Sequence, residues 1–181
     1  MSAIQLREIS YADRFDAALY AMMQSIDKDE NGFINHGKDI LWSQFPSLIE
    51  KFIAQRDAPE IKKGYVPQTV FWLLDRDEPI GYSKMRWYLT EPLSKHGGHI
   101  GYGIRKEKRR MGYGTRLLGL TLEKIRAIGV DDVLITCSAD NMGSRKVIEH
   151  NGGELEDEEA GHCRYWIRAA SRYLRCDDGT I

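Results

Sequence analysis

The sequence has no long hydrophobic run, few cysteines and almost no net charge. No apolar stretch approaches the ~20 residues that span a membrane, and the first residues contain no apolar signal core, so we expect no membrane span and no secretion signal. The chain has three cysteines, Cys137, Cys163 and Cys176, and their spacing is not that of metal ligands. We therefore expect reduced thiols, no metal and a cytoplasmic location. A net charge of −1 gives no reason to expect a nucleic-acid or membrane partner.

Helical and strand patterns alternate along the 181 residues, of which 42% are hydrophobic. We expect residues 1–181 to form a single domain with an α/β (α+β) fold and a mixed sheet. In the first half we expect a strand at 3–9, a helix after a capping box at Ser10 and Asp13, a helix broken or begun at Pro46, and an antiparallel hairpin of strands 69–75 and 80–89. A loop at 90–97, a strand at 99–104 and a helix at 113–128 follow. The last expected elements are a buried parallel strand at 133–137, a helix at 141–151, an acidic turn at 154–159 and a strand at 161–167.

A glycine-rich turn between the strand at 99–104 and the helix at 113–128 is the most informative feature. Its sequence, Arg-Arg-Met-Gly-Tyr-Gly-Thr over residues 109–115, predicts several backbone N–H groups aimed at one point, at the positive end of a helix dipole. This indicates a site for a phosphate-bearing ligand. No Gly-Lys-Ser/Thr closes the turn and the third glycine of a dinucleotide fingerprint is absent, which argues against a P-loop or a Rossmann turn.

The run from Ile104 to Thr115 resembles the acetyl-CoA signature of the GNAT superfamily of N-acetyltransferases, a hydrophobic strand end followed by Gln/Arg-x-x-Gly-x-Gly/Ala. A second element of that family follows, consisting of the strand at 133–137, Asn141 with Ser144 one turn later, and the Gly-Gly pair at 152–153. The resemblance implies a mixed, mostly antiparallel central sheet flanked by helices, with a strand–glycine turn–helix–strand unit at its centre. It also implies acetyl-CoA as co-substrate.

The resemblance assigns the cofactor contacts residue by residue. The strand-end amide of Ile104 bonds the cofactor, the turn cradles the pyrophosphate, and Asn141 and Ser144 meet the pantetheine arm and the thioester end. The basic side chains at 105–110 have two interpretations, a solvated charged turn or contacts to phosphates. The predicted cofactor-binding residues are Ile104, Arg109, Arg110, Met111, Gly112, Tyr113, Gly114, Thr115, Asn141 and Ser144.

The chain departs from the family pattern at the catalytic acid. Many members carry a tyrosine seven residues after the asparagine, where it protonates the departing thiolate, whereas this position is Ile148. The strand before the turn offers His99 and Tyr102 as catalytic candidates, each with a structural alternative as a hydrogen-bonded histidine or a packed aromatic residue. Cys137 is interpreted as a buried, inert thiol rather than a nucleophile.

Residues 27–34 match the first eight positions of a calcium-binding EF-hand loop. The twelfth position requires a glutamate and is occupied by Lys38, which argues against calcium. We interpret 27–38 as a polar loop between two helices that borders the acceptor site. This hypothesis predicts that replacing Asn35 or His36 alters acceptor preference and leaves the affinity for acetyl-CoA unchanged.

The sequence therefore predicts an acetyl-CoA-dependent N-acetyltransferase in which a primary amine attacks the thioester directly in a ternary complex. The amine belongs to a small molecule or a peptide that the sequence does not identify. The missing tyrosine favours a first alternative, a non-catalytic domain that binds or senses acyl-CoA, and a second alternative is another nucleotide-binding enzyme with the same turn. Aromatic residues in the last strand favour a homodimer.

Overall fold

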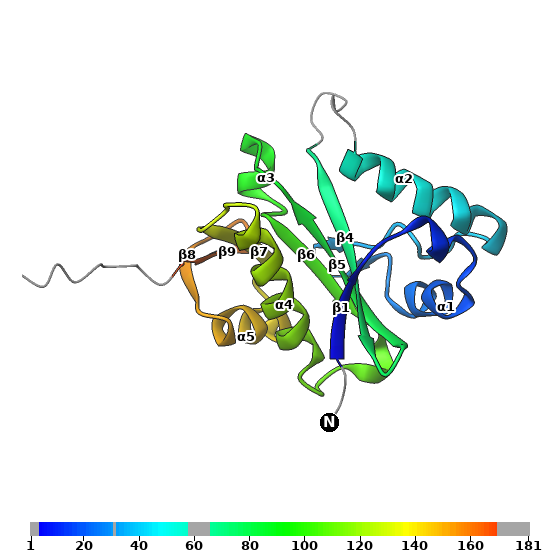
Figure 1. Ribbon diagram of the computed structural model, residues 1–181. Coiled ribbons are helices and arrows are strands. Elements are labelled where there is room, and N and C mark those ends of the chain that lie inside the picture. Colours follow the sequence, from blue (N-terminus) through cyan, green and yellow to red (C-terminus); the bar gives the residue numbers. More distant parts are fainter. Residues whose placement is uncertain (1–3, 31, 58–65, 170–181) are drawn as a thin grey trace, which may run out of the picture.

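Two antiparallel sheets lie at the centre of the molecule, with helices on both sides (Figure 1). The computed structural model describes residues 4–30, 32–57 and 66–169. The first sheet has the order β1 (Ile4–Glu8), β4 (Gln68–Asp75), β5 (Glu78–Arg86) and β6 (Ile100–Ile104). The second has the order β7 (Val133–Ser138), β9 (His162–Ile167) and β8 (Gly153–Glu159). The predicted fold class, α/β (α+β) with a mostly antiparallel sheet flanked by helices, is confirmed.

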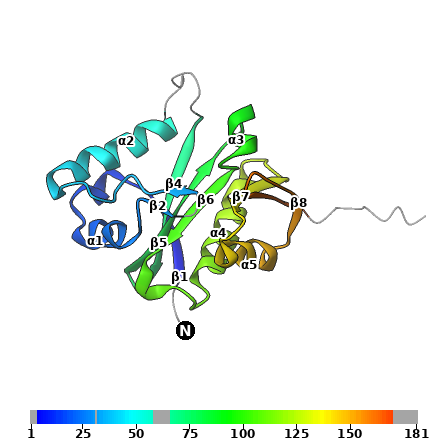
Figure 2. The ribbon, with the colours of Figure 1, turned by 180° about the vertical axis from the view of Figure 1, so that it is seen from behind.

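The helices divide between the two faces of the first sheet, as the views from front and back show (Figures 1 and 2). Helices α1 (Ala17–Ser25) and α2 (Phe45–Asp57) cover one face, whereas α4 (Tyr113–Ala127) covers the other and packs against α5 (Met142–His150). The shorter elements are the turns η1 (Tyr11–Phe15), η2 (Trp42–Gln44) and η3 (Lys106–Lys108), the helix α3 (Glu91–Lys95), and the hairpin of β2 (Asp29–Glu30) and β3 (Phe33–Ile34).

Strand alternation sorts the core residues between these two layers. Successive residues of a strand point to opposite faces, so Trp72 and Tyr82 join the cluster under α1 and α2, whereas Phe71 and Met85 join the cluster under α4. The same alternation places Lys84 of β5 on the α1–α2 face. The two faces of this one strand pair therefore contribute to different parts of the site.

The predicted N-terminal helix is two elements. The backbone N–H of Ser10 donates to Asp13 at 2.8 Å, as the capping box requires, but the box begins the single turn η1. Asp16 then has an extended backbone, and its side chain accepts from the amides of Ala18 and Leu19 to begin α1. Phe15 is consequently 69% exposed instead of continuing the apolar face.

Other differences concern strands and loops. The strand β7 was expected to be parallel, but its ladder partner is the antiparallel β9. Residues 154–159 form the edge strand β8 instead of a turn, because Arg164 of β9 pairs across the ladder with Glu156 at 2.7 Å and Asp157 at 3.0 Å. The segments at 27–38 and 90–97 contain the β2–β3 hairpin and α3, respectively, rather than loops alone. Pro46 lies in the first turn of α2, so the helix begins there.

Several expectations concern partners and ligands. In the described ranges no helix has the length and apolar character to cross a membrane. The same ranges contain no group of three or more His, Cys, Asp or Glu side chains that could hold a metal ion. Cys176 lies outside the described residues. The last strand, β9, is the central strand of its sheet and has partners on both edges, so the homodimer stays a prediction.

Candidate active site

The two sheets meet at His99 and Leu134 and part beyond them. The backbone N–H of His99 donates to the carbonyl of Leu134 at 2.7 Å, and the N–H of Leu134 donates to Nδ1 of His99 at 2.9 Å. Past this point β6 is the edge strand of one sheet and β7 the edge strand of the other. The edge of β6 that faces away from β5 therefore keeps backbone groups for a ligand.

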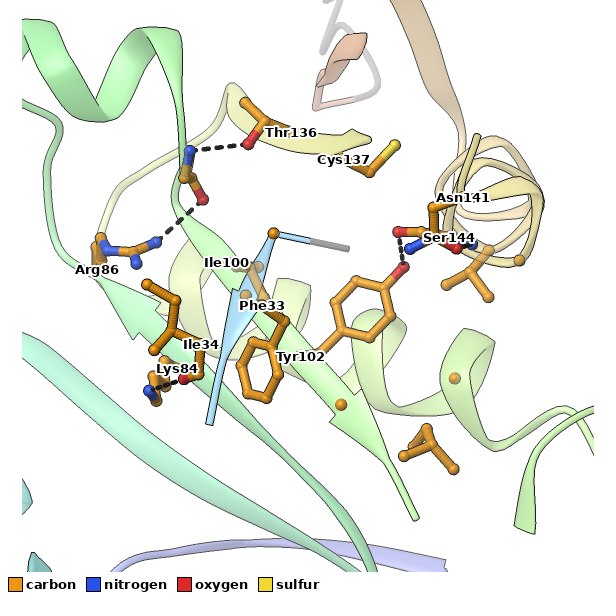
Figure 3. Close-up of a pocket in the computed structure, with 18 of the residues that line it drawn as sticks. Phe33, Ile34, Lys84, Arg86, Ile100, Tyr102, Thr136, Cys137, Asn141 and Ser144 are labelled. Atoms are coloured by element: carbon orange, nitrogen blue, oxygen red, sulfur yellow. Dashed lines mark hydrogen bonds between the residues drawn. The ribbon is translucent and has the colours of Figure 1, made fainter. Parts of the chain in front are cut away.

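A cavity of about 960 Å³ occupies the opening between the sheets (Figure 3). Its lining comes from both faces of the first sheet, from the glycine-rich turn, and from the start of α5. Phe33 and Tyr102 lie between two ends of this cavity, with Lys84 and Arg86 on one side and Asn141 and Ser144 on the other. The cavity therefore joins the predicted cofactor site to a second chamber on the α1–α2 face of the sheet.

The glycine-rich turn forms as predicted. Gly112 has φ +83°, a left-handed conformation that glycine adopts without steric cost, and it precedes the first residue of α4. Arg110 also has a positive φ, of 60°, so the same loop is left-handed at two positions, a conformation found in anion-binding nests. Because the first N–H groups of a helix have no partner within it, the start of α4 presents donors and positive potential to the cavity.

The residues of the basic run have different positions, and the contact to phosphates stays a prediction. Lys106 pairs with Asp27 at 2.8 Å and Lys108 with Glu78 at 2.7 Å, as expected for a solvated turn. Arg109 and Arg110 instead line the cavity, and Nε of Arg109 donates to the carbonyl of Ile104 at 3.0 Å. The run thus fixes the turn with some cations and presents others to the cavity.

The start of α5 lies across the cavity from the turn. The side chain of Asn141 caps α5 by accepting from the N–H of Ser144 at 3.0 Å. The hydroxyls of Ser144 and Tyr102 are 2.9 Å apart, so β6 and α5 are joined at the cavity wall. Cys137 lies nearby, and burial raises the pKa of its thiol to about 11, which leaves it protonated at neutral pH.

Eight of the ten predicted cofactor-binding residues line the cavity. The two that do not are Met111, which is 61% exposed, and Tyr113, whose hydroxyl donates to Asp75 at 2.6 Å. The structure thus brings together Ile104, Arg109, Arg110, Gly112, Gly114, Thr115, Asn141 and Ser144.

The two catalytic candidates have different positions. Tyr102 lines the cavity, and burial raises the pKa of its hydroxyl well above the ordinary value. His99 is outside the lining, buried, and its Nδ1 is occupied by the amide of Leu134, which favours the structural interpretation. Ile148, at the usual tyrosine position, is fully buried in the core under α4.

The second chamber contains side chains that sequence reasoning missed. Lys84 of β5 is only 4% exposed, and Lys51 of α2 and Arg86 of β5 line the same cavity. The sequence feature that could have indicated Lys84 as a site residue is its position as the single charged residue in the run from Ile80 to Met85. Gln55, Gln68, His36 and His96 are further polar residues in the cavity lining.

The β2–β3 hairpin closes this chamber by lying on β6. Phe33 covers Gly101 and Gly103, where an added Cβ would come within 3.1 Å and 2.8 Å of its ring. Asn35 anchors the segment after the hairpin, since its fully buried amide donates to the carbonyls of Met23 and Ile26 and its oxygen accepts from Tyr82. Asn35 therefore has a structural position, whereas His36 next to it lines the cavity.

Comparison with known proteins agrees with this architecture. The family model described as "Acetyltransferase (GNAT) domain" matches residues 4–154. No curated protein sequence matches the chain significantly. Among solved structures, the ribosomal L7/L12 alpha-N-protein acetyltransferase RimL in complex with coenzyme A is 16% identical, with a TM-score of 0.66 over 92% of this chain and 94% of that chain.

Two further structures have the same fold. RimJ of Mycobacterium smegmatis, in complex with a CoA-disulfide, is 17% identical with a TM-score of 0.64, covering 92% of this chain and 82% of that chain. The microcin C7 self-immunity acetyltransferase MccE, in complex with acetyl-CoA and AMP, is 16% identical with a TM-score of 0.64. The match covers 91% of this chain and 92% of that chain. With the family match spanning most of its length, the chain belongs to the GNAT acetyltransferases.

Proposed function

We propose that the protein is an acetyl-CoA-dependent N-acetyltransferase that transfers an acetyl group to a primary amine in a ternary complex. The observation that supports this most is the continuity of the cavity, which extends from the glycine-rich turn, past the free edge of β6, into a second chamber on the other face of the sheet. RimL and MccE, which have the same fold, are named as acetyltransferases and have coenzyme A or acetyl-CoA bound.

The residues present fit this co-substrate. The turn at Gly112 offers backbone donors, and Arg110 and Lys146 add positive charge to the lining, as a pyrophosphate requires. The free edge of β6 suits the amides of a pantetheine arm. Asn141 and Ser144 stand where the resemblance expects the thioester end. When bound, acetyl-CoA supplies an acetyl group activated as a thioester.

The acceptor nitrogen loses two protons, one before attack and one to solvent as the amide forms, and the leaving sulfur gains one. An alkyl ammonium has a pKa near ~10, so the acceptor must lose a proton before its nitrogen attacks the acetyl carbon. No carboxylate among the described lining residues takes that proton, and we assign its removal to solvent. As the carbon–sulfur bond breaks, the Tyr102–Ser144 hydroxyl pair delivers a proton to the leaving sulfur, since Tyr102 keeps its proton at neutral pH.

The first test measures binding. The protein is titrated calorimetrically with acetyl-CoA, and with ATP and NAD as controls. We expect acetyl-CoA alone to bind, and Gly112→Glu to abolish this binding by placing bulk and negative charge in the turn. Gly129→Glu is the matched control, because Gly129 has a similar φ of +89° with equally open surroundings at the other end of α4. Retained affinity in a folded Gly112→Glu protein would refute the site.

A screen of primary amines by release of free thiol then tests turnover. Binding without turnover on any amine would favour the non-catalytic acyl-CoA-binding domain, for which the buried Ile148 is the supporting observation. Preference for ATP or NAD would favour another nucleotide-binding enzyme.

A further inference from the structure

A group of basic side chains lines the chamber on the α1–α2 face, opposite the Tyr102–Ser144 pair. Lys84 and Arg86 come from β5, Lys51 from α2, and His36 from the segment after the hairpin. Figure 3 shows Lys84 and Arg86 together on the side of the cavity away from Asn141 and Ser144. Strand and helix positions far apart in the sequence thus converge on one small volume.

Lys84 is the buried member of this group. Its Nζ donates to the carbonyl of Ile34 at 2.7 Å and is 2.8 Å from Nδ1 of His36. The rings of Phe33, Phe52 and Tyr82 lie 5.3 to 5.8 Å from the same nitrogen. These contacts stabilise a cation in part, but an ammonium has three N–H groups and the two polar contacts leave one of them for a ligand.

The chamber lacks a balancing negative charge within the described residues. None of the charged side chains that line the cavity is an aspartate or glutamate, and neither Lys51, Lys84 nor Arg86 has an ion pair there. Burial and the like charges of Arg86 and Lys51 lower the pKa of Lys84 to about 7. Such mutual repulsion lowers the stability of the folded protein unless an anion enters.

We propose that this chamber is the acceptor subsite and that it takes a small primary amine carrying a carboxylate or a phosphate. The anionic group contacts Lys84 and Lys51, and the amine extends past Phe33 toward the free edge of β6. The proposal rests on the proposed acetyltransfer and adds the chemical class of the acceptor. It requires no group beyond the side chains already in the chamber.

The test compares matched acceptors by thiol release in the presence of acetyl-CoA. The carboxylate arm is β-alanine against β-alanine amide, and the phosphate arm is 2-aminoethyl phosphate against ethanolamine. We expect at least one anionic amine to exceed its uncharged counterpart at least tenfold in kcat/KM, about 1.4 kcal/mol. The pair of acceptors that shows this difference tells whether the subsite prefers a carboxylate or a phosphate. Equal turnover of both members in both arms, or preference for the uncharged members, would overturn the proposal.

Two variants locate the effect. Lys51→Gln, on the exposed surface of α2, is expected to raise KM for the anionic amine more than KM for its uncharged counterpart. Lys84→Met, which removes the charge and shortens the side chain by one atom, should remove the discrimination. Lys124→Gln on the exposed side of α4 is the control. An unchanged ratio in both Lys51→Gln and Lys84→Met, or a kcat loss shared equally by charged and uncharged amines, would contradict an anion-binding role.

A binding measurement tests the acceptor subsite independently of turnover. In the protein saturated with coenzyme A, calorimetric titration with β-alanine and with 2-aminoethyl phosphate is expected to detect one of them, and to lose it in Lys51→Gln. If acetyl-CoA binds but neither anionic amine binds, the subsite is wrong while the proposed function stands. If acetyl-CoA itself does not bind, the proposed function fails first.

Discussion

Nδ1 of His99 accepts a hydrogen bond from the backbone N–H of Leu134 at 2.9 Å, at the point where the two sheets part. The opposite bond, from the N–H of His99 to the carbonyl of Leu134, completes the connection. The ring must be neutral to accept, and burial lowers its pKa from 6.5 to about 4. The opening of the active site is therefore fixed by a residue outside its lining.

This contact predicts a pH-dependent stability. The unfolded chain binds the His99 proton at higher pH than the folded protein, so the free energy of unfolding falls as the pH drops from 6.5 toward 4. The contribution of His99 between pH 7 and pH 5 is about 2 kcal/mol. In His99→Asn the amide oxygen can still accept from Leu134. Urea unfolding of this variant should show a smaller fall in the free energy of unfolding between pH 7 and pH 5. His150→Asn at the exposed end of α5 is the control for removal of a histidine.

The same variant tests the catalytic hypothesis for His99. We expect folded His99→Asn to keep acetyl-CoA affinity and most of its turnover at pH 7, because the ring does not line the cavity. A loss of kcat of about 100-fold or more, typical of a missing general base, would restore His99 as a catalytic residue.

The Tyr102–Ser144 pair predicts non-additive effects on the chemical step. Tyr102→Phe should lower kcat about 100-fold with acetyl-CoA affinity nearly unchanged. Ser144→Ala should have a similar effect on kcat, and the double variant should be little worse than either single one because the two hydroxyls act together. Tyr20→Phe, which removes a hydroxyl outside the cavity, is the control. Full additivity would show that the pair does not act as a unit.

Asn35 and His36 are adjacent but should respond differently to substitution. Asn35→Ala leaves buried donors and acceptors without partners, so chemical denaturation should show a loss of at least about 3 kcal/mol. His36→Gln should keep its stability and change KM for the acceptor, with acetyl-CoA affinity unaltered. A shift in acceptor preference in a stable Asn35→Ala protein would contradict the structural position of Asn35.

The cofactor half of the site could be predicted because its signals are local. The turn around Gly112 combines a strand end, glycines and a helix start within a dozen residues, and the cap at Asn141 lies one turn from Ser144. The chamber with Lys84 could not be predicted in this way. Its basic side chains come from β5, α2 and the segment after β3, and no local spacing connects them.

The errors in the fold have similar causes. A strand buried on both faces, such as β7, has the same apolar run in a parallel or an antiparallel ladder. The acidic strand β8 has the composition of a turn, but its ladder with β9 and the ion pairs of Arg164 with Glu156 and Asp157 support the strand. In both cases the tertiary contacts, and not the local composition, determine the strand pairing.

The position of Phe33 on Gly101 and Gly103 has an evolutionary consequence. The hairpin that carries Phe33 is a separate two-stranded sheet, and the turn at Gly112 belongs to another segment of the chain. Insertions or exchanges in this hairpin can thus reshape what enters the chamber while the machinery beyond β6 is inherited unchanged. In this architecture a new specificity requires few mutations, and these fall on a segment of the chain separate from the one that defines the family.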